Sequence, residues 1–247
     1  MQRHSRIKAF REDAGRKEER TLSEARAHCL GLIGGLGVGA AVHYYRSLAQ
    51  AHERRQLPLH LLMTHADLNR VVSGVQANRL DDLADYFAAL IAQLKAGGAT
   101  FAAIPAVTPH ICIAELRPRS PLPLVDILEV VRAAKIAKRI ALFGSRFTIE
   151  TDMFGVLAGN NTIRPQPGEV EQIHEAYMRT ASVGEGAEVD RQALTAMARR
   201  LMERDGVEAI VFAGTDLALL FNESNPPFPL IDCAQLHLDA ILQKLLP

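Results

Sequence analysis

The sequence contains no tryptophan and only three cysteines, Cys29, Cys112 and Cys233, among 247 residues. Three widely spaced cysteines support neither a disulfide framework nor a zinc site built from cysteine pairs, which favours a reduced, cytoplasmic protein. The longest uncharged run of apolar residues and glycine, residues 30–42, has 13 residues. A membrane-spanning helix needs about 18 or more, so we expect no membrane partner.

Net charge is also lacking, because 28 basic residues balance 28 acidic ones. The first 28 residues hold eight basic and five acidic side chains, which leaves a net charge of −3 on the rest of the chain. This part of the chain therefore has no positive electrostatic potential that would attract nucleic acid. Residues 1–28 also lack the apolar centre of a signal peptide, and we interpret them as a charged N-terminal extension, mobile or helical and outside the fold.

What the sequence does contain is an alternation of apolar runs of strand length with amphipathic helical segments. Strands are expected over residues 29–34, 57–65, 100–107, 140–145, 207–214 and 228–233. Helices are expected between them, among them helices over about residues 80–95, 168–179 and 190–204. This alternation is typical of βαβ units and parallel sheets. We predict an α/β fold of two similar, flavodoxin-like or Rossmann-like lobes with the site in the cleft between them. The first lobe would comprise residues 29–127 plus 230–247, and the second residues 128–229.

Turns of small or hydroxylated residues follow four of the predicted strands. In parallel sheets ligands bind outside the carboxyl ends of the strands, where backbone N–H groups of helix N-termini favour anions. The same residues also serve as ordinary turns and helix caps, but four such turns together favour a small anionic ligand between the lobes. The four turns are Gly34-Gly35-Leu36-Gly37, Ala106-Val107-Thr108, Gly144-Ser145-Arg146 and Gly214-Thr215-Asp216.

The first turn also fits part of a dinucleotide-binding fingerprint. Gly35, Gly37 and Ala40 match G-x-G-x-x-A after a strand. The fingerprint needs an acidic residue about 20 positions further on, where the second strand ends. Asp67 arrives a few positions late, so an NAD-dependent oxidoreductase is the least favoured of three hypotheses.

Five segments in order carry a family resemblance. They are IGGLGVGAAVHYY from Ile33 to Tyr45, AVTPH from Ala106 to His110, LFGSRFT from Leu142 to Thr148, AGTD from Ala213 to Asp216, and PLID from Pro229 to Asp232 followed by His237. With these segments the chain resembles the aspartate/glutamate racemase family, the cofactor-independent amino-acid racemases, over about residues 29–247.

The resemblance implies a small amino acid or carboxylate ligand, no cofactor and a homodimer. The helix that carries Tyr44 and Tyr45 could contribute to the interface, or these tyrosines could instead pack against the sheet. The resemblance also implies a two-base mechanism by two cysteine thiols, but Ala106 and Gly214 stand at those two positions. Neither side chain can carry a proton. By resemblance and position, the substrate-binding candidates are Gly35, Leu36, Gly37, Thr108, Ser145, Arg146 and Thr215.

Four titratable residues near the predicted site could act as a base, namely His110, Asp216, and His65 and Asp67 at the end of the second strand. His110 and Asp216 are our candidate catalytic residues. Each could support a one-base reaction if its pKa suits the working pH. Each could equally be structural, His110 by bonding a loop carbonyl and Asp216 by capping a helix. No metal site is predicted, because His60 and His65 point to opposite faces of a strand. The first hypothesis is therefore an altered isomerase or lyase, and the second is a catalytically silent carboxylate-binding protein that senses or carries its ligand.

Overall fold

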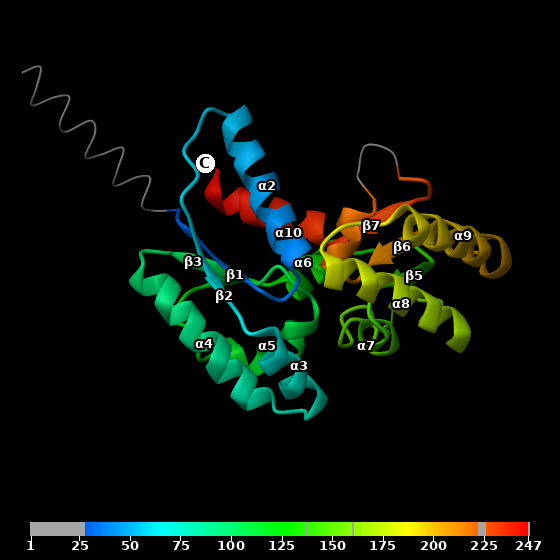
Figure 1. Ribbon diagram of the computed structural model, residues 1–247, viewed down its shortest axis with the longest axis horizontal. Coiled ribbons are helices and arrows are strands. Elements are labelled where there is room, and N and C mark those ends of the chain that lie inside the picture. The colour runs from blue at the N-terminus through cyan, green and yellow to red at the C-terminus, as the bar shows by residue number, and fades with distance from the viewer. Residues whose placement is uncertain (1–27, 137, 160, 222–225, 247) are drawn as a thin grey trace, which may run out of the picture.

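The computed structural model describes residues 28–136, 138–159, 161–221 and 226–246. Residues 1–27, nearly all of the predicted N-terminal extension, lie outside the described residues. Figure 1 shows two groups of strands, each with helices around it, and the last helix, α10, beside the first long one, α2.

The first sheet contains four parallel strands in the order β2-β1-β3-β4. The central strand β1 is buried along its whole length, as its apolar sequence predicts. Its side chains alternate between two cores, because successive residues of a strand face opposite sides of the sheet. Leu30 and Leu32 join the core beneath α2 and α10, and Ile33 joins the core beneath α4. The elements of this part are β1 (Leu30–Gly34), α2 (Val38–Arg54), β2 (Leu61–His65), α3 (Leu68–Gln76), α4 (Leu80–Ala96), β3 (Phe101–Ala103), the 3₁₀ helix η1 (Thr108–Cys112), α5 (Ile113–Leu116), β4 (Leu124–Val125) and α6 (Ile127–Ala133).

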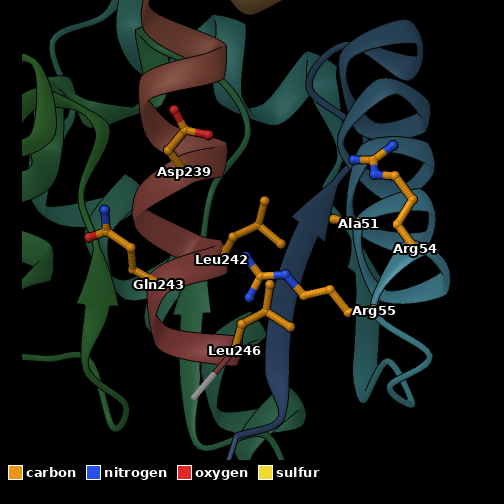
Figure 2. A pocket seen from close by; sticks show the side chains of 7 residues that line it. All are labelled: Ala51, Arg54, Arg55, Asp239, Leu242, Gln243 and Leu246. Atoms are coloured by element: carbon orange, nitrogen blue, oxygen red, sulfur yellow. The ribbon is translucent and has the colours of Figure 1, made fainter.

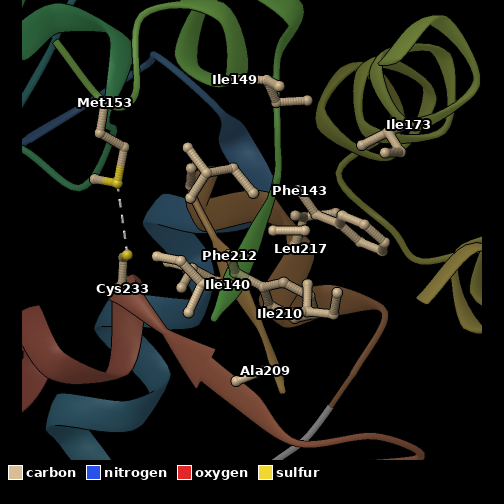
Figure 3. Close-up of a cluster of buried hydrophobic side chains, with 14 of the residues drawn as sticks. Ile140, Phe143, Ile149, Met153, Ile173, Ala209, Ile210, Phe212, Leu217 and Cys233 are labelled. Carbon is tan, nitrogen blue, oxygen red and sulfur yellow. Dashed lines mark hydrogen bonds between the residues drawn. The ribbon is translucent and has the colours of Figure 1, made fainter. Parts of the chain in front are cut away.

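The second sheet contains three parallel strands in the order β5-β6-β7. Both β5 and β6 are fully buried, and Figure 3 shows Phe143 and Phe212 from these strands in one cluster with Ile173 of α8. Cys233, at the start of α10, contacts Met153 at the edge of the same cluster. The elements are β5 (Ile140–Phe143), α7 (Arg146–Glu150), α8 (Pro167–Val183), α9 (Glu188–Asp205), β6 (Ala209–Phe212), the 3₁₀ helix η2 (Thr215–Leu219), β7 (Leu230–Asp232) and α10 (Cys233–Leu245).

The last segment of the chain joins the two halves. Strand β7 pairs with β6, so residues 230–232 belong to the second sheet, although the predicted boundaries assigned them to the first lobe. Helix α10 then returns to the first sheet, where Leu238 and Ile241 enter the core beneath α2. The predicted α/β class with two parallel sheets is confirmed. Among the described residues, no helix is both long and apolar enough to cross a membrane.

Candidate active site at the junction of the two sheets

The turns that follow β3 and β6 meet although they lie about 110 positions apart in the sequence. The hydroxyl of Thr215 is buried and donates a hydrogen bond to the backbone oxygen of Pro105 at 3.0 Å. This contact brings the segments of Ala106 and Gly214 together at the carboxyl ends of two strands from different sheets. Two of the four predicted turns are thus in contact, and Thr215 uses its hydroxyl to join them.

The glycine turn after β1 belongs to the same junction. Gly35 has a φ of +90°, and a Cβ there would lie 2.4 Å from the backbone oxygen of Ala66, so only glycine fits. A Cβ on Gly37 would lie 2.7 and 2.8 Å from the two carboxyl oxygens of Asp216. Gly37 therefore lets the start of α2 approach the carboxyl group of η2.

Asp216 lies at the centre of this junction and is 2% exposed. Its Oδ1 accepts a hydrogen bond from the N–H of Ala40, in the first turn of α2, at 3.2 Å. The hydroxyl of Tyr177, on α8, also donates to this carboxyl group. Burial raises the pKa of Asp216 to about 6, even though both hydrogen bonds favour the ionised form. The group is therefore a carboxylate at neutral pH, placed at the positive end of a long helix.

The fourth turn, after β5, uses its side chains locally. Ser145 caps α7, and its Oγ accepts the N–H of Thr148 at 3.2 Å. The half-exposed guanidinium of Arg146 forms an ion pair with Glu171 of α8. In the described structure Arg146 is thus paired with a surface carboxylate, and a ligand would have to compete with Glu171 for it.

His110 is buried, and its ring bonds the turn that follows β3. Its Nδ1 donates to the backbone oxygen of Ala106 at 2.8 Å, and its Nε2 lies 3.8 Å from Oδ1 of Asp126. Its side chain is 1% exposed, and burial lowers its pKa despite the nearby Asp126 carboxylate. This geometry describes a neutral imidazole that supports the β3 turn. His110 and Asp216 are equally buried, and what distinguishes Asp216 is its pKa, which is raised to about 6.

Two further predicted ligand-binding residues are half-buried beside these turns. Thr108 begins η1, directly after the turn of Ala106. Leu36, in the glycine turn, packs against the core beneath α4. Both remain ligand-binding candidates.

None of the three cysteines provides a thiolate at the junction. Burial raises the pKa of Cys112 to about 12, and its Sγ lies 3.3 Å from the oxygen of Pro109. The pKa of Cys29 and that of Cys233 are raised by burial too. In the part of the chain that the structure describes, no group of three or more His, Cys, Asp or Glu side chains could hold a metal ion.

Asp67, the acidic residue nearest to the end of β2, acts as a helix cap. Its Oδ1 accepts the N–H groups of Asn69 and Arg70 at 2.9 and 3.2 Å. This residue therefore does not complete the dinucleotide fingerprint of the first glycine turn.

Three cavities are lined by other parts of the first half. One of about 550 Å³ lies between the C-terminal ends of α2 and α10, with Arg54 and Arg55 on one side and Leu242 on the other (Figure 2). The other two, of about 580 and 320 Å³, follow the outward face of α2 and strand β2. None of the three is lined by Thr215 or Asp216, although Gly35 lines the smallest one.

Sequence reasoning missed two residues of α8 that contact the predicted turns, one at the junction and one at the turn after β5. Tyr177 bonds Asp216, and Nδ1 of His174 accepts the N–H of Arg146 at 3.2 Å. The pKa of His174 is lowered by burial and by Arg146. The two residues are three positions apart, so they lie on one face of the helix. That spacing was the available signal, but nothing in it shows which loops the helix covers.

The fold and the junction define a class of protein with two parallel α/β halves whose strand ends face a shared site. The model of the Asp/Glu/Hydantoin racemase family matches residues 33–241, and the chain belongs to this family. The predicted resemblance is thereby confirmed.

Solved structures agree on the fold. A candidate Asp/Glu racemase from Yersinia pestis is 23% identical with a TM-score of 0.73, covering 89% of this chain and 99% of its own. An aspartate racemase homologue from Pyrococcus horikoshii is 18% identical with a TM-score of 0.69, covering 87% and 98%. The aspartate racemase of Picrophilus torridus is 18% identical with a TM-score of 0.66, covering 88% and 94%.

Proposed function

We propose that this protein binds a small amino acid or related carboxylate at the junction of its two sheets and catalyses an altered isomerase or lyase reaction with a base other than a thiol. The observation that carries the proposal is the buried carboxyl group of Asp216, held where the turns after β1 and β6 meet. Family membership and the structures of racemases support the ligand class.

The chemistry follows from the pKa of Asp216. A carboxyl group with a pKa of about 6 is ionised at neutral pH, yet it binds a proton more strongly than an ordinary aspartate does. Such a group suits general base catalysis near neutrality. One base can remove a proton from one face of a substrate carbon. Return of a proton to that carbon on the same face gives exchange without inversion, and transfer of the proton to an adjacent atom gives an isomer. Loss of a leaving group from the neighbouring carbon gives the product of a lyase.

Thiol-based racemisation is not part of the proposal, because Ala106 and Gly214 carry no proton and the cysteines elsewhere are buried or half-buried thiols. The proposal invokes no cofactor, in keeping with the family resemblance. The free cysteines remain our reason to expect a cytoplasmic protein.

The alternative function is a catalytically silent binding protein. Asp216 already bonds Ala40 and Tyr177 and is 2% exposed, which is also what a purely structural cap would show. A sensor or carrier would use the same junction to bind a carboxylate without removing a proton.

Proton NMR in deuterated buffer separates these functions. The protein is incubated with D- and L-aspartate, D- and L-glutamate and related carboxylates, and the α-proton signals are followed together with a chiral assay. We expect exchange that Asp216→Asn abolishes and that Asp239→Asn leaves unchanged, because Asp239 is exposed and bonds Gln235 on its own helix. Ligand line broadening without exchange would establish the binding protein instead, and neither effect would overturn the ligand class.

A further inference from the structure

The ring of Tyr177 occupies the space that a side chain at position 214 would need. A Cβ built on Gly214 would lie 2.4 Å from Cε2 of Tyr177 and 3.0 Å from both Cδ2 and Cζ. Real Cβ atoms do not approach other heavy atoms so closely. The glycine after β6 and the tyrosine of α8 therefore form a matched pair, in which one residue leaves empty the volume that the other fills.

The hydroxyl of the same tyrosine bonds Asp216, so its position determines how the carboxyl group is held. From the opposite side, the N–H of Ala40 bonds Oδ1, and Gly37 leaves room for both oxygens. Tyr177 belongs to α8, next to the second sheet, and Ala40 belongs to α2, next to the first. The carboxyl group is thus fixed between elements of both halves.

The elements around Tyr177 and Gly214 are tightly packed, which limits the other positions that the tyrosine ring could take. A Cβ on Gly39 of α2 would lie 2.3 Å from Leu219 of η2 and 2.7 Å from the oxygen of Gly184, which ends α8. The backbones of α2 and of the end of α8 are therefore in close contact, and the side chain of Leu219 from η2 packs against Gly39. Interiors packed in this way do not deform continuously.

We propose that Tyr177 is a positioning residue of the site, whose ring closes the space above Gly214 and whose hydroxyl holds the carboxyl group of Asp216 against the start of α2. This inference rests on the proposed function, in which Asp216 is the base. It assigns to Tyr177 the orientation of that base, and the proton itself is transferred by Asp216.

The groups that face Asp216 determine which change in its pKa the test should show. They are the hydroxyl of Tyr177 from α8, the N–H of Ala40 from α2 and the N–H of Asp216 itself, while the buried phenol of Tyr44 is a more distant neighbour. The Tyr177 hydroxyl is the side-chain donor in this set. Its removal should therefore raise the pKa of Asp216, whereas loss of packing alone would lower thermal stability without this change.

The experiment measures the titration of the Asp216 carboxyl carbon by ¹³C NMR in the ligand-free full chain, with the signal assigned from its absence in Asp216→Asn. We expect Tyr177→Phe, which keeps the ring, to raise the midpoint by about one pH unit. The control Tyr45→Phe makes the same chemical change at an exposed tyrosine and should leave the midpoint unchanged. An unchanged midpoint in Tyr177→Phe overturns the proposal.

A second variant tests the contact between Tyr177 and Gly214 by changing the glycine. Gly214→Ala should push the ring away, raise the Asp216 midpoint in the same direction and lower the melting temperature. Gly168→Ala, on α8, adds a methyl group where no atom lies within 4 Å and serves as its control. Unaltered stability and titration in Gly214→Ala would show that the ring does not occupy this space.

Exchange assays on the same variants distinguish this proposal from the proposed function. The acidic limb of the pH profile of kcat/KM, which reports the free protein, should move upward in Tyr177→Phe by the same amount as the carboxyl titration, with a loss of about tenfold in kcat/KM at pH values below that limb. A shifted titration with no exchange in any variant would overturn the catalytic function and leave the positioning of Asp216 intact.

Discussion

At the scale of single residues, the protonation of Asp216 couples the stability of the protein to pH. Its pKa in the folded chain is about 6, above the value of about 3.9 for an unperturbed aspartate. The folded state therefore binds this proton more strongly than the unfolded state. The resulting stabilisation is fully present below about pH 3.9 and is lost as the pH rises through 6.

We predict that the free energy of unfolding of the wild type, relative to Asp216→Asn, falls by about 2–3 kcal/mol between pH 4 and pH 7. The difference between the two proteins is the quantity to measure, by urea unfolding at each pH. The difference is used because the buried residues His110 and His237 also change the stability with pH, in the opposite sense, and do so in both proteins. Their pKa values are lowered, that of His237 to about 4, so their contributions are lost as the pH falls. A difference that does not vary with pH would contradict the raised pKa of Asp216.

At the scale of elements, one hydrogen-bonded chain joins α2, α10 and β4. The Nε2 of His237 donates to the backbone oxygen of Val125 at 2.9 Å, so its Nδ1 accepts the hydroxyl proton of Tyr44 at 3.0 Å. Tyr44 and His237 are both fully buried. This chain fixes how α10, which follows the second sheet, packs on the first.

Tyr44→Phe should therefore destabilise the protein by about 1–3 kcal/mol, because it leaves Nδ1 of His237 buried without a donor. The adjacent Tyr45 is 52% exposed, and Tyr45→Phe should change the free energy of unfolding by less than about 0.5 kcal/mol. Chemical denaturation of the two variants measures this contrast. Equal effects would mean that the buried hydrogen bond contributes no net stability.

The helices and strands also show which parts of the fold the sequence can predict and which it cannot. Strands β1, β5 and β6 and helices α4, α8 and α9 were predicted because their apolar runs and periodic patterns are local properties. Helix α3 was missed because Val71, Val72 and Gly74 are poor helix formers. It is supported by the Asp67 cap and by Leu83, whose side chain would clash with any Cβ on Gly74. Strand β4 has two residues and is defined by its pairing with β3.

The candidate site likewise has features that the sequence predicts and features that it does not. Turns after strands are readable because glycine and hydroxyl residues mark them, and the turns after β1, β3 and β6 do lie at one junction. The burial of His110 and the contact of Tyr177 with Gly214 depend on packing between distant segments. Sequence spacing alone contains no information on either.

At the scale of the whole molecule, an apolar surface on the first half is exposed in the part of the chain that the structure describes. Val38, Val42 and Tyr45 of α2 are 63%, 46% and 52% exposed, and their spacing places them on one face of the helix. Beside them, Met63 on β2 is 47% exposed, and the cavity of about 320 Å³ is lined by all four side chains. Strand β2 is at the edge of its sheet, and its outer edge pairs with no other strand among the described residues.

We predict that a second copy of the chain covers this surface, as expected for a homodimer that uses the helix of Tyr44 and Tyr45. Exposed apolar patches of this kind mark interaction sites, and a symmetric dimer would cover the helix face and the strand edge together. Val42→Glu should place a charge in the centre of the interface and weaken self-association by at least about thirtyfold.

Sedimentation equilibrium across a concentration series measures this association for the wild type, Val42→Glu and a control, Met178→Glu. Met178 lies on α8 and is 42% exposed, so the control adds the same charge at a comparable apolar site away from the patch. A wild-type dimer that Val42→Glu dissociates and Met178→Glu leaves intact places the interface on α2. A monomeric wild type, or a dimer that resists Val42→Glu, would refute that placement. Because the patch contains neither Asp216 nor Tyr177, a monomeric Val42→Glu variant should retain the Asp216 titration of the wild type.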